Sequence, residues 1–147
     1  MCPCYRRALP KSSLWPPPLL RDRGLPARIA FAVLLPIGFG ALCGLAFDVS
    51  VIGFNVLSAL GIPGGVGGGY EHPTWRGGFV RGLSGGVLYS AGLVLAPALR
   101  AASPIASLPM PLLAVAAISP VMGTLLGVFG GWLRGRRDGK SAALTAS

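Results

Sequence analysis

The sequence predicts an all-α fold: a polytopic integral membrane protein in which four transmembrane helices form a bundle and both chain ends lie in the cytoplasm. Three observations lead to this fold class. Apolar residues make up 52% of the 147 residues, only four residues are acidic, and the mean hydropathy is +0.66, a composition that suits a bilayer better than a water-soluble core. Long uncharged segments have lengths close to the thickness of the hydrocarbon layer. The 13 Lys and Arg residues lie almost entirely outside those segments.

The N-terminal segment is basic and rich in proline. Residues 1–28 hold six basic residues and six prolines, a composition that can neither propagate a helix nor bury a core. We therefore expect residues 1–28 to form a disordered cytoplasmic tail. An alternative interpretation makes this tail the basic start of a secretory signal with residues 29–47 as its apolar core. Both segments are longer than usual for a signal, which favours an uncleaved first span.

The first helix is expected over residues 29–47. This run contains 19 residues without a charge, and a helix of that length reaches about 28 Å, close to the hydrocarbon thickness. Asp48 follows at once, and a second uncharged run begins at Val49. We therefore expect a tight helical hairpin that turns at Asp48, with the second helix over residues 49–67.

The end of the second apolar run is rich in glycine. Residues 61–69 contain six glycines and Pro63. Each interior glycine costs about 1 kcal/mol relative to alanine, and proline lacks a backbone donor. We expect the helix to fray or break near Gly61. The break is either the exit from the membrane, which we favour, or a functional discontinuity of the kind that transporters use.

The third helix is expected over residues 80–99. Residues 70–76 form the most polar internal segment and include Tyr70 and Trp75, aromatic types that sit at the headgroup level. The 18 residues from 82 to 99 are uncharged. Arg81 lies near the start of this helix, where its guanidinium can snorkel to the interface.

The fourth helix is expected over residues 111–133. The uncharged run 101–133 has 33 residues and would span about 50 Å as a helix, too long for one crossing. Three prolines, at positions 104, 109 and 111, suit an external connection before a helix that starts near Pro111 and is kinked at Pro120. Residues 134–147 are then a basic cytoplasmic tail.

The asymmetry of the basic residues sets the predicted orientation. Twelve of the 13 fall in residues 1–28, 70–81 and 134–147, and only Arg100 falls on the opposite side. Because positively charged flanks are retained in the cytoplasm, four spans predict that both ends are cytoplasmic in the cell membrane. Cations placed beside apolar segments contribute about 1 kcal/mol each at anionic headgroups, so we expect lipid rather than nucleic acid as the partner.

Glycine recurs at four-residue spacing in the third and fourth helices, as in a glycine zipper. The residues are Gly78, Gly82 and Gly86 in the third helix and Gly123, Gly127 and Gly131 in the fourth, with Gly40 and Gly44 as a shorter version in the first. Small residues let helix backbones approach closely in lipid, which predicts tight packing of these two helices within the chain or across a homo-oligomer. The alternative, a glycine-lined pore, would normally show a ring of polar or charged side chains as well.

Asn55 is the polar residue at membrane depth that we single out. It is expected to form a hydrogen-bond clasp between helices, or, in the alternative, to serve transport together with Arg81. No Asp, Glu, Lys or His lies in the middle of a predicted span. This counts against a proton-coupled transporter, which usually depends on such a residue.

An enzyme or a metal protein is not expected. Glu71 and His72 are adjacent, but no nucleophile or phosphate-binding loop accompanies them, so a solvated turn is the simpler interpretation. Cys2 and Cys4 would need further ligands to hold a metal, and the chain has one histidine and only one other cysteine. We predict no catalytic residue, no metal site and no cofactor.

The function expected from these features is that of a small non-enzymatic membrane protein that acts through helix packing with protein or lipid partners. The alternative is a small channel or transporter that uses the break at residues 61–69 and Asn55.

Overall fold

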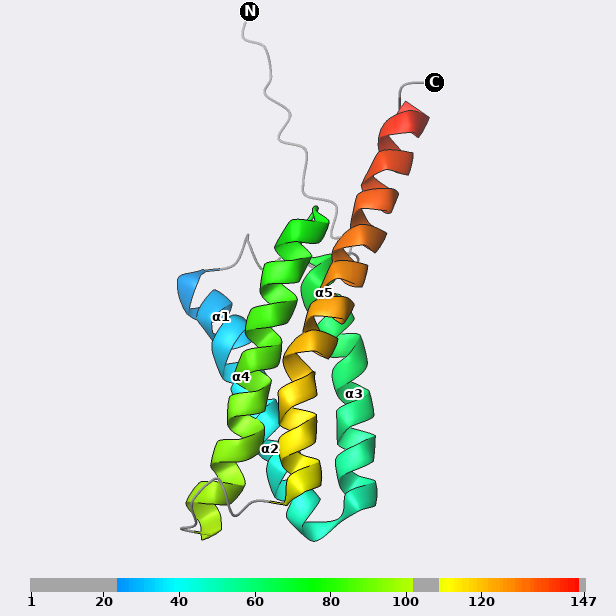
Figure 1. Ribbon diagram of the computed structural model, residues 1–147. Helices are drawn as coiled ribbons and strands as arrows, with labels where there is room; N and C mark the ends of the chain where they lie inside the picture. The colour runs from blue at the N-terminus through cyan, green and yellow to red at the C-terminus, as the bar shows by residue number, and fades with distance from the viewer. Residues whose placement is uncertain (1–23, 102–108, 146–147) are drawn as a thin grey trace, which may run out of the picture.

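The structure is a computed structural model that describes residues 24–101 and 109–145, and these residues are helical apart from short connections (Figure 1). The elements in chain order are α1 (Leu25–Ile29), the π-helical segment η2 (Ala30–Leu34), α2 (Leu35–Val49), α3 (Val51–Tyr70), α4 (Trp75–Ala101) and α5 (Met110–Thr145). Because α1, η2 and α2 follow one another without a gap, they form one span, Leu25–Val49. Four helices are thus long and apolar enough to cross a bilayer, which confirms the all-α prediction with four spans at the level of length and composition.

The first span begins earlier than predicted. Helix α1 starts at Leu25, with Pro26 in its first turn, where the missing N–H of proline leaves no carbonyl unpaired. Residues 25–28 are therefore helical and not part of a disordered tail. The rest of that predicted tail, with Cys2 and Cys4, lies outside the described residues.

The hairpin between the first two spans turns at Ser50 and not at Asp48. Ser50 has an extended backbone (φ −160°, ψ 118°), and its side-chain oxygen accepts a hydrogen bond from the Gly53 amide at 3.2 Å. A serine with this geometry caps the N-terminus of a helix, whereas Asp48 still belongs to the last turn of α2.

The predicted fraying of the second helix near Gly61 is wrong, because α3 runs unbroken through residues 61–69 to Tyr70. The glycine penalty is measured on helices in water, where an unwound backbone can hydrogen-bond to solvent. In a bilayer the helix is the conformation that keeps backbone groups paired. Glycine also serves α3 as a contact: a Cβ at Gly69 would come closer than 3.0 Å to the backbone of Gly127 in α5.

Helices α4 and α5 are longer than predicted at their polar ends. Helix α4 starts at Trp75, where the Thr74 hydroxyl accepts a hydrogen bond from the Gly77 amide at 3.3 Å and caps the helix. Helix α5 passes through Pro120 and continues to Thr145, so the predicted C-terminal tail is helical over residues 134–145. Figure 1 shows this end of α5 projecting beyond the other helices.

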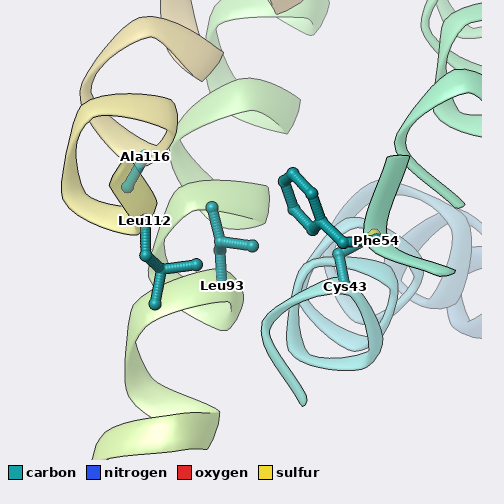
Figure 2. Packing of buried hydrophobic residues seen from close by; sticks show 5 residues of the cluster. All are labelled: Cys43, Phe54, Leu93, Leu112 and Ala116. Carbon is teal, nitrogen blue, oxygen red and sulfur yellow. The ribbon is translucent and has the colours of Figure 1, made fainter. Parts of the chain in front are cut away.

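The four spans form a bundle in which spans that are consecutive in the chain run in opposite directions (Figure 1). Helix α4 packs most extensively on α5 and α2, and α3 packs mainly on α5, so that α3 is only loosely packed on α2 and α4. A cluster of buried side chains joins all four spans in the half of the bundle nearest Ser50 (Figure 2). Its members are Cys43 from α2, Phe54 from α3, Leu93 from α4, and Leu112 and Ala116 from α5.

The outer surface is apolar. Large hydrophobic side chains such as Val49, Ile52 and Met110 are about four-fifths exposed, at 79%, 78% and 80%. In the part of the chain that the structure describes, no polar or charged residue is buried as a whole. A water-soluble monomer rarely exposes such a surface, whereas lipid tails cover it readily.

Candidate functional site

A cavity of about 620 Å³ lies between α2, α3, α4 and α5, on the side where α2 and α3 pack loosely. Glycines form much of its wall: Gly61, Gly64, Gly65, Gly68, Gly82, Gly85, Gly86 and Gly123. A Cβ at Gly64 would meet no atom within 4 Å, whereas a Cβ at Gly82, Gly86 or Gly123 would come closer than 3.0 Å to the backbone of a neighbouring helix. The volume of the cavity falls within the usual range of small-molecule sites.

The cavity is closed at one end and open at its side. Phe54 belongs both to the cavity wall and to the buried cluster, and Tyr89 and Val115 line the cavity while packing against that cluster. The cluster therefore closes the end nearest Ser50. Leu35 of α2 and Leu60 of α3 stand at the rim and are 55% and 61% exposed, so the opening lies between these two helices.

Near the other end of the cavity, η2 leaves two carbonyl groups without their ordinary helical donors. In an α-helix the Phe31 carbonyl would accept from the Leu35 amide, but this amide donates to the Ala30 carbonyl, as a π-helix requires. The Ala32 carbonyl would accept from residue 36, which is Pro36 and has no N–H. Two adjacent carbonyls of the first span, those of Phe31 and Ala32, thus lack the amide donor four residues later in the chain.

Arg81 of α4 supplies donors to both of these carbonyls. Its two terminal nitrogens donate to the Phe31 carbonyl at 2.8 Å and to the Ala32 carbonyl at 3.3 Å. The guanidinium is thereby fixed between the first span and α4 at the wall of the cavity. These bonds hold the guanidinium against the first span, and the snorkelling of Arg81 to the interface stays a prediction.

Part of the Arg81 side chain has no protein partner. Its Nε atom is buried and finds no hydrogen-bond acceptor among the described residues. Gly68 and Gly85 border the group: a Cβ at Gly68 would lie 3.9 Å from Nε and a Cβ at Gly85 3.5 Å from a terminal nitrogen, both ordinary van der Waals distances. The hydroxyl of Ser58, another residue of the cavity wall, is also buried without a partner in residues 24–101 and 109–145.

Asn55 does not belong to this site. Its side-chain amide donates to the Val51 carbonyl of its own helix at 2.8 Å, and the residue is exposed on the outer surface. Asn55 lies near the start of α3, at the end of the bundle that holds Ser50. Arg81 lies near the start of α4, at the opposite end of the bundle. The structure therefore does not bring Asn55 and Arg81 together, and within the described chain Asn55 forms no bond to another helix.

The six glycines singled out in the sequence lie at the contact between α4 and the strongly packed face of α5. A Cβ at Gly78, Gly82 or Gly86 would come closer than 3.0 Å to backbone atoms of α5. A Cβ at Gly123 or Gly127 would come equally close to the backbone of α4, and one at Gly131 would lie 2.8 Å from the Thr74 carbonyl. These faces are used within one chain, so a second copy of the protein would have to bind elsewhere.

Sequence reasoning missed three further glycines at helix contacts. Gly92 of α4 allows a close approach to the backbone of α2, and Gly40 and Gly44 of α2 allow the same approach to α4. Gly69 of α3 and Gly130 of α5 lie at the contact between those two helices. The four-residue series of Gly61, Gly65 and Gly69 carried a signal for the second of these contacts. Gly92 has no glycine four residues away, although Ala96 follows it at that spacing and Gly85 precedes it by seven residues.

The end of the bundle with the α3 to α4 connection is rich in arginine. Arg134 donates to the carbonyls of Tyr70 and Glu71 at 3.3 and 3.5 Å, which satisfies the C-terminal end of α3, and Arg137 donates to the Tyr70 hydroxyl at 3.1 Å. The Arg134 guanidinium also lies 3.4 Å from a carboxylate oxygen of Asp138.

A second, shallow cavity of about 610 Å³ opens at the same end. Trp75 and Trp132 line it, with Arg76 and Arg136 beside them, and the Arg136 guanidinium lies 4.1 Å from the centre of the Trp132 ring. Aromatic and basic side chains placed together in this way suit the headgroup region of a bilayer.

Neither Glu71 nor His72 is part of a metal centre in the described chain. Within residues 24–101 and 109–145, no group of three or more His, Cys, Asp and Glu side chains is arranged to hold a metal ion. The ring of His72 packs close to Gly77, at the start of α4.

Comparisons with protein-family models, curated proteins and solved structures find no match to this chain. The function of the cavity therefore has to be inferred from its own residues.

Proposed function

We propose that the chain is a non-enzymatic, multi-pass protein of the cell membrane that binds a lipid in the cavity between α2, α3, α4 and α5. The observation that carries this proposal is the cavity itself: about 620 Å³ in volume, lined mainly by glycine and apolar side chains, and open between α2 and α3. The opening would face the acyl chains of a surrounding bilayer, because the rim residues Leu35 and Leu60 are exposed.

The proposed orientation places both ends of the chain in the cytoplasm. Arg28, Arg76 and Arg134 belong to the helix ends at one side of the bundle, and Arg100 belongs to the other. The excess of positive charge supports a cytoplasmic position for the first side. The exposed Trp75 and Trp132 would then lie at the cytoplasmic headgroups.

A lipid suits the cavity better than an ion in transit. The buried cluster closes the end nearest Ser50, so the cavity is not a continuous path across the described bundle. An empty apolar space in contact with lipid tails is filled at little cost by a hydrocarbon chain, whereas water would find few partners there. The channel or transporter alternative relied on a break in α3 and on Asn55, and neither feature supports it.

Two matched substitutions in α3 test lipid binding. A Cβ at Gly64 or at Gly67 would meet no atom within 4 Å, so leucine at either position leaves the fold intact, but only Gly64 lines the cavity. We expect Gly64→Leu to reduce the lipid retained per protein molecule about tenfold, equivalent to about 1.4 kcal/mol of binding free energy. Gly67→Leu should leave it unchanged.

The measurement is native mass spectrometry of protein purified in a mild detergent, with bound lipid counted per chain. Equal lipid retention by wild type, Gly64→Leu and Gly67→Leu would show that the cavity is not the binding site. The absence of bound lipid from all three would exclude the proposal as a whole.

A further inference from the structure

We infer that the cavity selects an anionic phospholipid from the cytoplasmic leaflet, with Arg81 binding the headgroup phosphate and the apolar part of the cavity receiving an acyl chain. This inference rests on the proposed function and adds the chemical class of the lipid. Three independent features of the structure lead to it: the free donors of Arg81, its depth in the bundle, and the charge of the surrounding residues.

The first feature is the hydrogen-bonding capacity of Arg81. A guanidinium carries five N–H donors, and the carbonyls of Phe31 and Ala32 each take one. The Nε donor is buried and unpaired within the described residues. A phosphate offers several acceptor oxygens in a geometry that matches the guanidinium fork, so it would use the donors that remain.

The charge of Arg81 is also uncompensated at short range. The two carbonyl partners are neutral, and the only ion pair within 4.0 Å among the described residues joins Arg134 and Asp138. Glu71 interacts with Arg81 electrostatically but lies beyond that distance. A guanidinium at the wall of an apolar cavity favours an anionic ligand, because taking a charge out of water is costly unless it is paired.

The second feature is depth. Arg81 follows Trp75 by six residues, which places it about 9 Å along α4 from an aromatic residue of the interfacial type. This is the depth at which headgroups give way to hydrocarbon. From Arg81 the cavity continues along α4 to Tyr89 and along α3 to Phe54, away from the headgroup side. A phospholipid matches this arrangement, with its phosphate at Arg81 and a chain directed toward Phe54.

The third feature is the positive charge at this end of the bundle, which favours a headgroup of net negative charge over a zwitterionic one. The described arginines at this end are Arg28, Arg76, Arg81, Arg134, Arg136 and Arg137, against the two carboxylates of Glu71 and Asp138. The ammonium group of a zwitterionic lipid would lie among these cations and be repelled. An anionic headgroup gains their attraction.

The test is a competition between two lipids of equal chain length. Wild-type protein in vesicles of equimolar phosphatidylglycerol and phosphatidylcholine is extracted with mild detergent, and the two retained lipids are counted by native mass spectrometry. We expect wild type to retain phosphatidylglycerol over phosphatidylcholine about fivefold, and Arg81→Gln to lose this preference. Arg76→Gln removes the same charge from the same helix outside the cavity, and should keep most of the preference, because Arg81 and the other arginines at this end remain.

A second variant keeps the inference testable if Arg81→Gln misfolds. If Arg81→Gln does not fold, the double variant Pro36→Ala, Arg81→Gln restores an N–H at residue 36 for the Ala32 carbonyl and removes the need for the arginine donors at that group. It too is expected to retain both lipids equally.

The outcomes separate this inference from the proposed function. Lipid retention that Gly64→Leu abolishes, without a preference for phosphatidylglycerol in wild type, would overturn the role of Arg81 and leave the lipid site standing. Loss of the preference in Arg76→Gln as well as in Arg81→Gln would assign it to general surface charge and also overturn the inference. Failure to retain any lipid would exclude both.

Discussion

Arg81 and Pro36 act on the same short stretch of backbone, although they lie on different helices. Pro36 deprives the Ala32 carbonyl of its helical donor, and Arg81 replaces that donor from α4 at 3.3 Å. In water the carbonyl would simply be hydrated. At the edge of a hydrocarbon layer an unpaired carbonyl costs about 1–3 kcal/mol, so the proline gives the arginine a structural role.

This relation predicts an energetic coupling between the two residues. Arg81→Met removes all guanidinium donors and should destabilise the protein by about 2 kcal/mol, because the carbonyls of Phe31 and Ala32 lose their partner. In a Pro36→Ala background the Ala32 carbonyl regains an amide donor, and the cost of Arg81→Met should fall by about 1 kcal/mol. The measurement is a double-mutant cycle of unfolding free energies in mixed detergent micelles. Strictly additive effects would contradict the coupling.

The contrast between Arg81 and Asn55 shows what sequence can predict about single polar residues. Both were expected to matter because polar groups at membrane depth need partners, and both do have partners. Which partner each one uses depends on the direction of its helix face. Arg81 reaches carbonyls about 50 residues away in the chain, and only the packing of α4 on the first span brings them within reach.

Glycine serves two opposite purposes in the bundle. Where helices touch, as at Gly78 and Gly127, the absence of a Cβ lets two backbones meet. Where they do not touch, as at Gly64, it leaves room that forms the cavity. Spacing in the sequence indicates that a face is made of small residues, but it does not distinguish contact from empty space.

The contact role predicts a severe effect for a large side chain at Gly127. A Cβ there would come closer than 3.0 Å to backbone atoms of both Gly78 and Gly82, which cannot move aside as a side chain can. We expect Gly127→Leu to destabilise the bundle by about 3 kcal/mol or more. Gly139→Leu is the control in the same helix, since a Cβ at Gly139 meets nothing within 4 Å.

The effect of Gly127→Leu is read from thermal unfolding in detergent, with size-exclusion chromatography to detect aggregation. Equal midpoints for Gly127→Leu and Gly139→Leu would show that α4 and α5 do not depend on their close contact.

The boundaries of the helices were predicted less well than their number. Hydrophobic length and charge fix how many spans a chain can form, because both are set by the bilayer. The positions at which the helices begin and end depend on local groups, such as the capping side chains of Ser50 and Thr74. They also depend on packing, as in α3, where contacts of Gly65 and Gly69 with α5 accompany a helix that propensity alone would end near Gly61.

The bundle as a whole separates charge between its two ends. The alternating directions of the four spans gather three segments at one end: the start of the first span, the α3 to α4 connection and the extension of α5. These segments carry most of the arginines of the described chain, whereas the opposite end carries Asp48 and Arg100. Arg134 connects two of the three segments through its bonds to the carbonyls at the end of α3.

This separation predicts which residues a membrane-impermeant thiol reagent reaches from each side. In a background without native cysteines, Gly139→Cys should be labelled only from the cytoplasm and Asp48→Cys only from outside, since both residues are exposed and lie at opposite ends of the bundle. The measurement compares labelling of intact cells with labelling of inverted vesicles. Labelling of both cysteines from one side would refute the four-span arrangement, because the three crossings of α3, α4 and α5 place the two positions on opposite sides. Labelling of each from the side opposite to that expected would keep the four spans and reverse the orientation, which would move Arg81 and its phosphate site to the outer leaflet.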